Sequence, residues 1–297
     1  KKCNICKSNM RQTNLKISNS YIYKCGDCKF ETLIPQPTKK ELDLIYTDTY
    51  FPLSELDEKN NSLVSILKNQ TAVRYLRRFQ KYKSPTKHKM LEIGCGDGDF
   101  LCAARDYNFQ ISALEYSNFA KKKLQQKFNK NEILIHIGEV YDLKQTKYDY
   151  IVFFDVLEHV RDPNKFMKKI YSLLNPGGLI FLVVPNKSSI TSRIMSKFWF
   201  EYKLEHISYF NSSNLSKLIS DTSFLELDKF CTIKTLNLKY IFSHFEKYPV
   251  PLLSSLFKFL DKYIHDKILN IPLPFYASGI GIVAQKKIKS KDRKPTR

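Results

Sequence analysis

The feature that most constrains this chain is a short apolar run ending in three closely spaced glycines, MLEIGCGDGDF at residues 90–100. Gly94, Gly96 and Gly98 fall at every second position, and an apolar helical pattern begins at Phe100. This order predicts a strand, a tight loop and the start of a helix. Glycine accepts positive φ angles and lets a ligand approach closely. The unpaired N–H groups at a helix start favour a ligand with a negative or electron-rich end.

Buried strands and helices alternate after this loop. The strands are expected at 90–94, 109–115, 132–137, 150–154, 179–184, 224–232 and 279–285, and the helices at 100–106, 118–129, 163–174 and 211–220. This alternation predicts an α/β fold with a Rossmann-like, seven-stranded, mostly parallel sheet and helices on both faces. A helical insertion is expected at 238–270, before the last strand. Ligands of this architecture bind at the carboxyl ends of the strands.

Four of the seven cysteines form two pairs, Cys3 with Cys6 and Cys25 with Cys28, and eighteen residues separate the pairs. This spacing is typical of a zinc ribbon, in which four thiolates close a tetrahedral shell around a structural zinc ion. The alternative is two disulfides, as in a secreted protein. The sequence as given begins without a signal-peptide pattern, which favours zinc and a cytoplasmic location.

The chain is expected to divide into a zinc ribbon at 1–34, a helical lead-in or lid at 35–84, a main α/β domain at 85–285 and a basic tail at 286–297. The excess of 49 Lys and Arg over 29 Asp and Glu gives a net charge of +20. Such a charge is compatible with nucleic acid, an anionic membrane surface or anionic substrates. The lysines are scattered, however, and a compositional bias on solvated faces explains them equally well.

No apolar run of 18 residues is present, so no transmembrane segment is expected. The insertion nevertheless carries a broad apolar face between residues 252 and 264, opposite lysines. This face either packs on the core or makes a peripheral contact with a membrane surface or a lipid-linked substrate.

Glu115 ends the second predicted strand, about twenty residues after the glycines. An acidic residue at this place accepts hydrogen bonds from both hydroxyls of a ribose and would repel a 2′-phosphate. The glycine loop lacks the Gly-x-Gly-x-x-Gly spacing of dinucleotide sites and the Lys-Ser/Thr pair of a P-loop. A nucleoside without phosphates therefore fits this site best.

Five segments together resemble the class I S-adenosylmethionine-dependent methyltransferases: LEIGCGDG (91–98), Glu115, YDYIVFFDVLEHV (148–160), LNPGG (174–178) and VPN (184–186). Their order and spacing match that family. The segment HISYF (206–210), the Cys-x-x-Cys pairs and PQPT (35–38) extend the similarity to a zinc-ribbon-bearing subgroup associated with the modification of sugars and cell-surface glycans.

This resemblance implies S-adenosylmethionine as the cofactor and a set of positions that would contact it: Glu92, Gly94, Gly96, Gly98, Glu115, Tyr116, Glu139, Val140 and Asp155. The glycines would admit the methionine part, with Glu92 near its amino group. Glu115 would hold the ribose. The alternative for Glu92 and Glu139 is a solvated carboxylate at a strand end, and the alternative for Asp155 is helix capping.

Methyl transfer to a hydroxyl acceptor also requires removal of a proton, and histidine titrates in the useful range. His206 and His159 both follow segments near the carboxyl ends of strands, and Asp155 would face the substrate. These three residues are the candidate catalytic groups. Tyr50 and Phe51 are candidates for closing over the cofactor.

Three functions are compatible with the sequence. The first is methyl transfer to oxygen or carbon of a small molecule, such as a sugar nucleotide or a lipid-linked glycan precursor. The second is methylation of RNA or another nucleic acid. Against it, Asp155 is followed by Val-Leu-Glu and not by the Pro-Pro-aromatic motif of amino-methylating DNA enzymes, and no Pro-Cys nucleophile is present there. The third is a non-catalytic module that only binds the cofactor.

Overall fold

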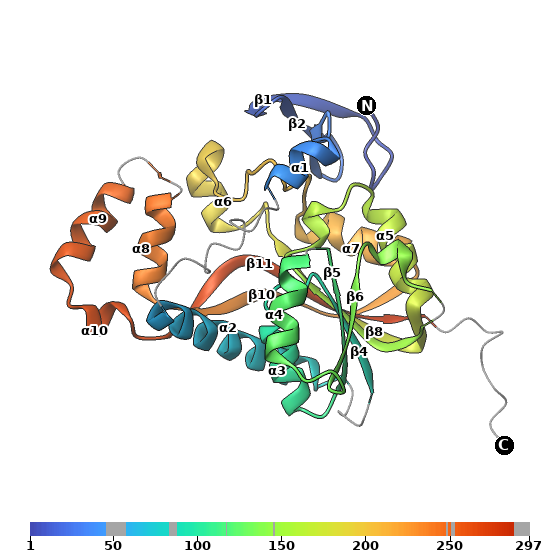
Figure 1. Ribbon diagram of the computed structural model, residues 1–297. Helices are drawn as coiled ribbons and strands as arrows, with labels where there is room; N and C mark the ends of the chain where they lie inside the picture. The colour runs from blue at the N-terminus through green and yellow to red at the C-terminus, as the bar shows by residue number, and fades with distance from the viewer. Residues whose placement is uncertain are drawn as a thin grey trace, which may run out of the picture.

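The computed structural model describes residues 1–45, 58–82, 88–116, 118–144, 146–247, 249–250 and 253–287. These residues build one small and one large sheet (Figure 1). The small sheet has the order β1-β2-β3-β9 and consists of β1 (Met10–Ile17), β2 (Ser20–Cys25), β3 (Glu31–Ile34) and β9 (Ser208–Tyr209). The large sheet has the order β10-β11-β8-β7-β4-β5-β6. Its strands are β4 (Lys89–Ile93), β5 (Gln110–Glu115), β6 (Ile133–Ile137), β7 (Tyr148–Phe154), β8 (Leu174–Pro185), β10 (Phe224–Leu236) and β11 (Leu273–Lys286).

The large sheet confirms the Rossmann-like prediction. Strands β8, β7, β4, β5 and β6 pair in parallel, whereas β11 runs antiparallel to both of its neighbours, so the sheet is mixed. Leu91 of β4 stands opposite Ser112 of β5 and Ile151 of β7. This register places the carboxyl ends of these three strands at one edge of the sheet, where ligands of such folds bind.

Helices cover both faces of the large sheet. The helices are α1 (Lys39–Ile45), α2 (Glu58–Phe79), α3 (Asp99–Asp106), α4 (Asn118–Lys127), α5 (Pro163–Leu173), α6 (Ile190–Met195), α7 (Ser212–Asp221), α8 (Leu238–Lys247), α9 (Leu253–Tyr263) and α10 (Asp266–Leu269). Side chains of α2, α3 and α4 share one buried cluster with the sheet, and those of α5 and α7 share the other. The largely apolar strands β7 and β8 fit this double coverage, because both of their faces are buried.

The N-terminal segment packs directly on the main sheet domain. Strand β3 pairs with β9, which lies about 175 positions later in the chain. The backbone N–H of Leu33 and the hydroxyl of Thr32 both donate to the carbonyl of Ile207, at 3.0 and 2.8 Å. At the start of α7, the side-chain amides of Asn211 and Asn214 both donate to the carbonyl of Cys28. The small sheet is therefore completed by a strand of the main domain.

Helices α8, α9 and α10 lie between β10 and β11, within the predicted insertion, and extend beyond one end of the large sheet (Figure 1). Phe257 of α9 packs against Phe242 and Phe245 of α8. Leu256 and Phe259 on the same helix are 51% and 59% exposed, so the apolar face of α9 is only partly covered. Among the described helices, none combines the length and the apolar character that crossing a membrane requires.

The aromatic centre of the large sheet provides a test of the fold. Phe181 of β8 is fully buried, and its ring lies 5.0 to 5.9 Å from the rings of Phe154, Tyr75, Phe79 and Phe230. We expect Phe181→Ala to lower the free energy of unfolding by about 3–5 kcal/mol, because it removes buried area and leaves a cavity. Denaturant titration measures this loss. Leu225→Ala on β10, where the side chain is half exposed, is the control and should change stability by less than about 1 kcal/mol. Equal losses for both variants would contradict this packing.

Candidate functional site

A cleft of about 700 Å³ opens at the carboxyl ends of β4, β5 and β7. Seven of the nine positions expected to contact the cofactor line it: Gly94, Gly96, Glu115, Tyr116, Glu139, Val140 and Asp155. Lys39 and Leu42 of α1 line the same cleft, and the ammonium of Lys39 lies 5.9 Å from the centre of the Tyr116 ring. The expected lead-in therefore reaches the cleft through α1, whereas Tyr50 and Phe51 lie outside the described residues.

The glycine loop turns sharply at the base of this cleft. Gly94 and Gly96 have φ angles of +68° and +50°, a region that other residues rarely adopt. A Cβ atom on Gly94 would stand 2.6 Å from Cγ2 of Val156, another cleft residue. The loop therefore needs glycine at position 94 for both its turn and its close approach to the segment after β7.

Glu115 joins the glycine loop to the next strand. Its carboxylate accepts hydrogen bonds from the backbone N–H groups of Gly96 at 2.9 Å and Tyr116 at 2.8 Å. The side chain is 8% exposed and lines the cleft. An ionised carboxylate only accepts hydrogen bonds, so Glu115 offers the cleft an acceptor that suits a hydroxyl donor.

Glu92 and Gly98 lie outside the cleft lining. Glu92 is 4% exposed, its Oε2 has no hydrogen-bond partner among the described residues, and burial raises its pKa well above the usual value, with Asp99 and Glu115 adding to the shift. The alternative of a solvated carboxylate is therefore wrong for Glu92. Gly98, at φ +74°, precedes α3, and a Cβ there would meet Leu124 of α4 at 2.6 Å, so packing explains this glycine.

Asp155 follows β7 with a φ of +53°, and its N–H donates to the carbonyl of Val183. Its carboxylate lies 2.8 Å from the ammonium of Lys234. Burial alone would lower the pKa of Lys234, but the Asp155 carboxylate raises it overall, so the lysine stays charged. The sequence analysis did not single out Lys234, which lies in β10 but two residues beyond the strand expected at 224–232.

His159 lies on the wall of the cleft, and His206 packs behind it with ring centres 4.7 Å apart and the rings nearly perpendicular. The Nδ1–H of His159 donates to the carbonyl of Glu205 at 3.0 Å. Burial lowers the pKa of His159 to about 4 and that of His206 well below its usual value, so both rings are neutral at pH 7. The structure thus brings His159 and His206 together, but only His159 is a cleft residue.

Two carboxyl groups that the sequence analysis did not single out lie beside these histidines. Glu158 is 1% exposed, and burial raises its pKa well above the usual value. Glu201 has an Oε2 atom 3.4 Å from Nδ1 of His206, and burial raises its pKa to about 7. Nothing in the local sequence distinguishes Glu201, because the fold and not the spacing brings it to His206.

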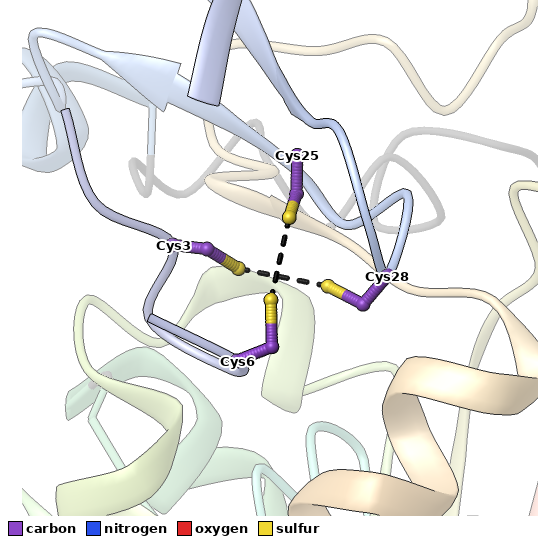
Figure 2. A group of neighbouring side chains, drawn as sticks. All are labelled: Cys3, Cys6, Cys25 and Cys28. Carbon is purple, nitrogen blue, oxygen red and sulfur yellow. Dashed lines mark hydrogen bonds between the residues drawn. The ribbon is translucent and has the colours of Figure 1, made fainter. Parts of the chain in front are cut away.

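The four paired cysteines converge on one point (Figure 2). The sulfurs of Cys3 and Cys28 are 3.6 Å apart, and those of Cys6 and Cys25 are 3.3 Å apart. All four are free thiols, and no sulfur lies more than 4.8 Å from another. Ligands at about 2.3 Å from a tetrahedral zinc ion stand about 3.8 Å from one another. The cluster therefore has the size and the donor set of a closed four-thiolate site.

Known proteins similar to this chain are methyltransferases. A Mycobacterium tuberculosis protein named "Probable S-adenosylmethionine-dependent methyltransferase" is 25% identical over 150 residues, which are 48% of this chain and 50% of that protein. This chain thus spans about half the length of that relative. The ubiquinone biosynthesis O-methyltransferase of Pelagibacter ubique is 25% identical over 173 residues, 54% of this chain and 71% of that protein. The crystal structure of magnesium protoporphyrin IX methyltransferase from Synechocystis with bound SAH superposes with a TM-score of 0.54 at 12% identity, covering 84% of this chain and 100% of that one. This likeness shows the fold.

A family model described as a methyltransferase domain matches residues 66–224. The match begins within α2 and ends where β10 begins, so it contains the glycine loop, Glu115 and the histidine pair. It covers more than half of the sequence. The chain therefore belongs to the methyltransferase-domain family.

Proposed function

We propose that this protein transfers the methyl group of S-adenosylmethionine to oxygen or carbon of a small molecule, with a sugar or cell-surface glycan precursor as the substrate class. The observation that carries the proposal is the cleft in which the Glu115 carboxylate and the glycine loop face each other. The names of the relatives, which include S-adenosylmethionine-dependent and ubiquinone biosynthesis O-methyltransferases, support methyl transfer. The sugar class rests on the resemblance at residues 206–210 and at the cysteine pairs.

The cleft residues fit a phosphate-free nucleoside. Glu115 would accept hydrogen bonds from both ribose hydroxyls, because its carboxylate lines the cleft and is a hydrogen-bond acceptor. Tyr116 and Val140 would contact the adenine, with Glu139 at its edge. Gly94 and Gly96 would lie against the methionine part. Glu92, whose Oε2 has no hydrogen-bond partner among the described residues, would face its amino group.

The acceptor would enter at the Asp155 and His159 side of the cleft. S-adenosylmethionine supplies the electrophilic methyl group, so the protein must align the acceptor and exclude water. The ion pair of Asp155 with Lys234 fixes one wall. Neutral His159 lies at the surface of the cleft and would receive or relay the acceptor's proton, with His206 supporting it from behind.

We infer that Cys3, Cys6, Cys25 and Cys28 hold a structural zinc ion. Four thiolates leave no open coordination position, so this ion would stabilise and not catalyse. The ribbon contacts the segment that carries His206 through Thr32 and Leu33. The zinc would therefore support the acceptor side of the cleft from a distance.

Glu115→Gln tests the cofactor site. The variant keeps the size of the side chain but removes its charge, so S-adenosylmethionine binding should weaken by about 1.5–3 kcal/mol, or roughly 10- to 150-fold. Isothermal titration calorimetry measures the change. Glu246→Gln, at an exposed side chain on α8, is the matched control and should bind like the wild type. Unchanged affinity of Glu115→Gln would show that the ribose does not lie at this carboxylate.

A labelling assay tests the acceptor class. The protein is incubated with methyl-labelled S-adenosylmethionine and either nucleotide sugars or RNA, at about 50 and 200 mM salt. We expect label in the sugar fraction, with a weak dependence on salt. Label in RNA that falls steeply with salt, as phosphate contacts require, would instead support the nucleic-acid alternative.

Cys28→Ser tests the zinc site. We expect the wild type to retain zinc at this cluster and the variant to lose it, because a structural site needs all four ligands. Loss of the ion should also increase amide hydrogen exchange at residues 205–210, where β9 completes the small sheet. Cys231→Ser, at an exposed cysteine, is the control. Unchanged zinc content in Cys28→Ser would refute the assignment.

A further inference from the structure

A second group of side chains that could hold a metal ion lies beside the cleft, apart from the cysteines. It consists of Glu158 and His159, from the turn η3 (Leu157–His159) after β7, and His206, from the segment before β9. Each residue offers a ligand atom, and these atoms all lie within 4.8 Å of one another. Glu158 and His159 are neighbours in the chain, whereas His206 comes almost fifty residues later. The fold, and not a local turn, therefore brings the three side chains together.

The carboxylate of Glu158 is buried without a hydrogen-bond partner among the described residues. Its side chain is 1% exposed, and neither carboxylate oxygen has a hydrogen-bond partner among the described residues. A buried polar group without a partner costs several kcal/mol, and a buried charge costs more. From this geometry we propose that Glu158, His159 and His206 together bind a divalent first-row metal cation. Such an ion would supply the positive charge and the coordination that the carboxylate lacks.

The outer contacts of the two histidine rings bear on whether they can bind a metal ion. A ligating imidazole commonly directs its other nitrogen to a carbonyl or a carboxylate. The Nδ1 of His159 lies 3.0 Å from the carbonyl of Glu205, and since a carbonyl only accepts, Nδ1 carries the proton and the lone pair lies on Nε2. The ring of His159 therefore has an outer partner of the expected kind. The Nδ1 of His206 lies 3.4 Å from the Glu201 carboxylate but makes no hydrogen bond among the described residues.

The donor set indicates the class of ion. Two imidazole nitrogens and one carboxylate oxygen suit zinc, iron(II) or manganese(II), whereas an ion that prefers only oxygen ligands would gain less from the imidazoles. Ligand atoms at about 2.0–2.2 Å from an ion stand no more than about 4.4 Å apart, so the side chains need to close by only a small amount. Three protein ligands leave coordination positions open, unlike the four cysteines.

The place of the group suggests what the ion would do. Asp155, three residues before Glu158, lines the cleft together with His159, so an open coordination position would face the acceptor side. A bound divalent ion lowers the pKa of a hydroxyl or water that coordinates it. With His159 bound to the ion, the ion would activate the acceptor hydroxyl in place of the proton transfer to His159 proposed above. This catalytic role rests on the proposed function, whereas binding of the cation does not.

Zinc stoichiometry tests the proposal directly. The full-length protein is dialysed to equilibrium against zinc, and bound metal is measured without cofactor or acceptor. We expect two zinc ions per wild-type chain, one at the cysteines and one at the new site. Glu158→Gln and His206→Asn should each bind one. His136→Gln, at a histidine outside the group, is the control and should bind two.

Thermal unfolding with and without added manganese(II) provides a second readout that keeps the test valid if a variant folds poorly. Wild-type protein already loaded with one zinc ion should gain stability from manganese(II), and folded Glu158→Gln should gain less. A wild-type protein that binds a single zinc ion, located at the cysteines by its loss in Cys28→Ser, would overturn the proposal. Two ions retained in both Glu158→Gln and His206→Asn would also overturn it. Cofactor affinity, measured separately, distinguishes these results from a failure of the proposed methyl transfer.

Discussion

The Glu115 carboxylate, by accepting hydrogen bonds from Gly96 and Tyr116, holds the glycine loop against the end of the neighbouring strand. Parallel pairing of β4 with β5 brings these two strand ends to the same edge of the sheet. The positive φ angles of Gly94 and Gly96 then let the loop bend toward β5. The shape of the cleft thus depends on one buried carboxylate and two glycines, and both are supported by a sheet that is buried on two faces.

The N-terminal ribbon is connected to the other side of the same cleft. Strand β3 pairs with β9, directly after His206, and the hydroxyl of Tyr202 donates to the Glu31 carboxylate. The segment between Glu201 and Tyr209 is therefore held at both ends by the small sheet. The N-terminal segment that carries the four cysteines therefore also contacts the stretch that contains Glu201 and His206.

Much of the cleft could be predicted from the sequence, because its residues follow strand ends at short and regular spacing. Gly94, Gly96, Glu115 and Asp155 are of this kind, and the parallel register alone brings them to one edge. Lys234 and Glu201 could not be predicted in this way. Lys234 reaches Asp155 only after an irregularity in the pairing of β10 with β11, and Glu201 meets His206 only through the fold of an irregular segment.

Other differences between the sequence predictions and the structure also have local causes. Gly98 matched the loop pattern, yet the contact that its missing side chain allows is with α4 and not with the cleft. The sequence analysis did not single out Glu158, because no sequence pattern shows that its carboxylate is buried without a hydrogen-bond partner among the described residues. Strand β9 has only two residues, too few for any periodicity, and its pairing with β3 depends on the docking of the ribbon.

We propose that a nucleoside sulfonium lies across the glycine loop with its ribose on Glu115. A crystal structure of the protein with S-adenosylhomocysteine tests this most directly. We expect both ribose hydroxyls to lie within hydrogen-bond distance of the Glu115 carboxylate. We expect the sulfur to lie on the Asp155 side of the cleft. Density for the ligand elsewhere, or a Glu115 side chain turned away from the ribose, would contradict it.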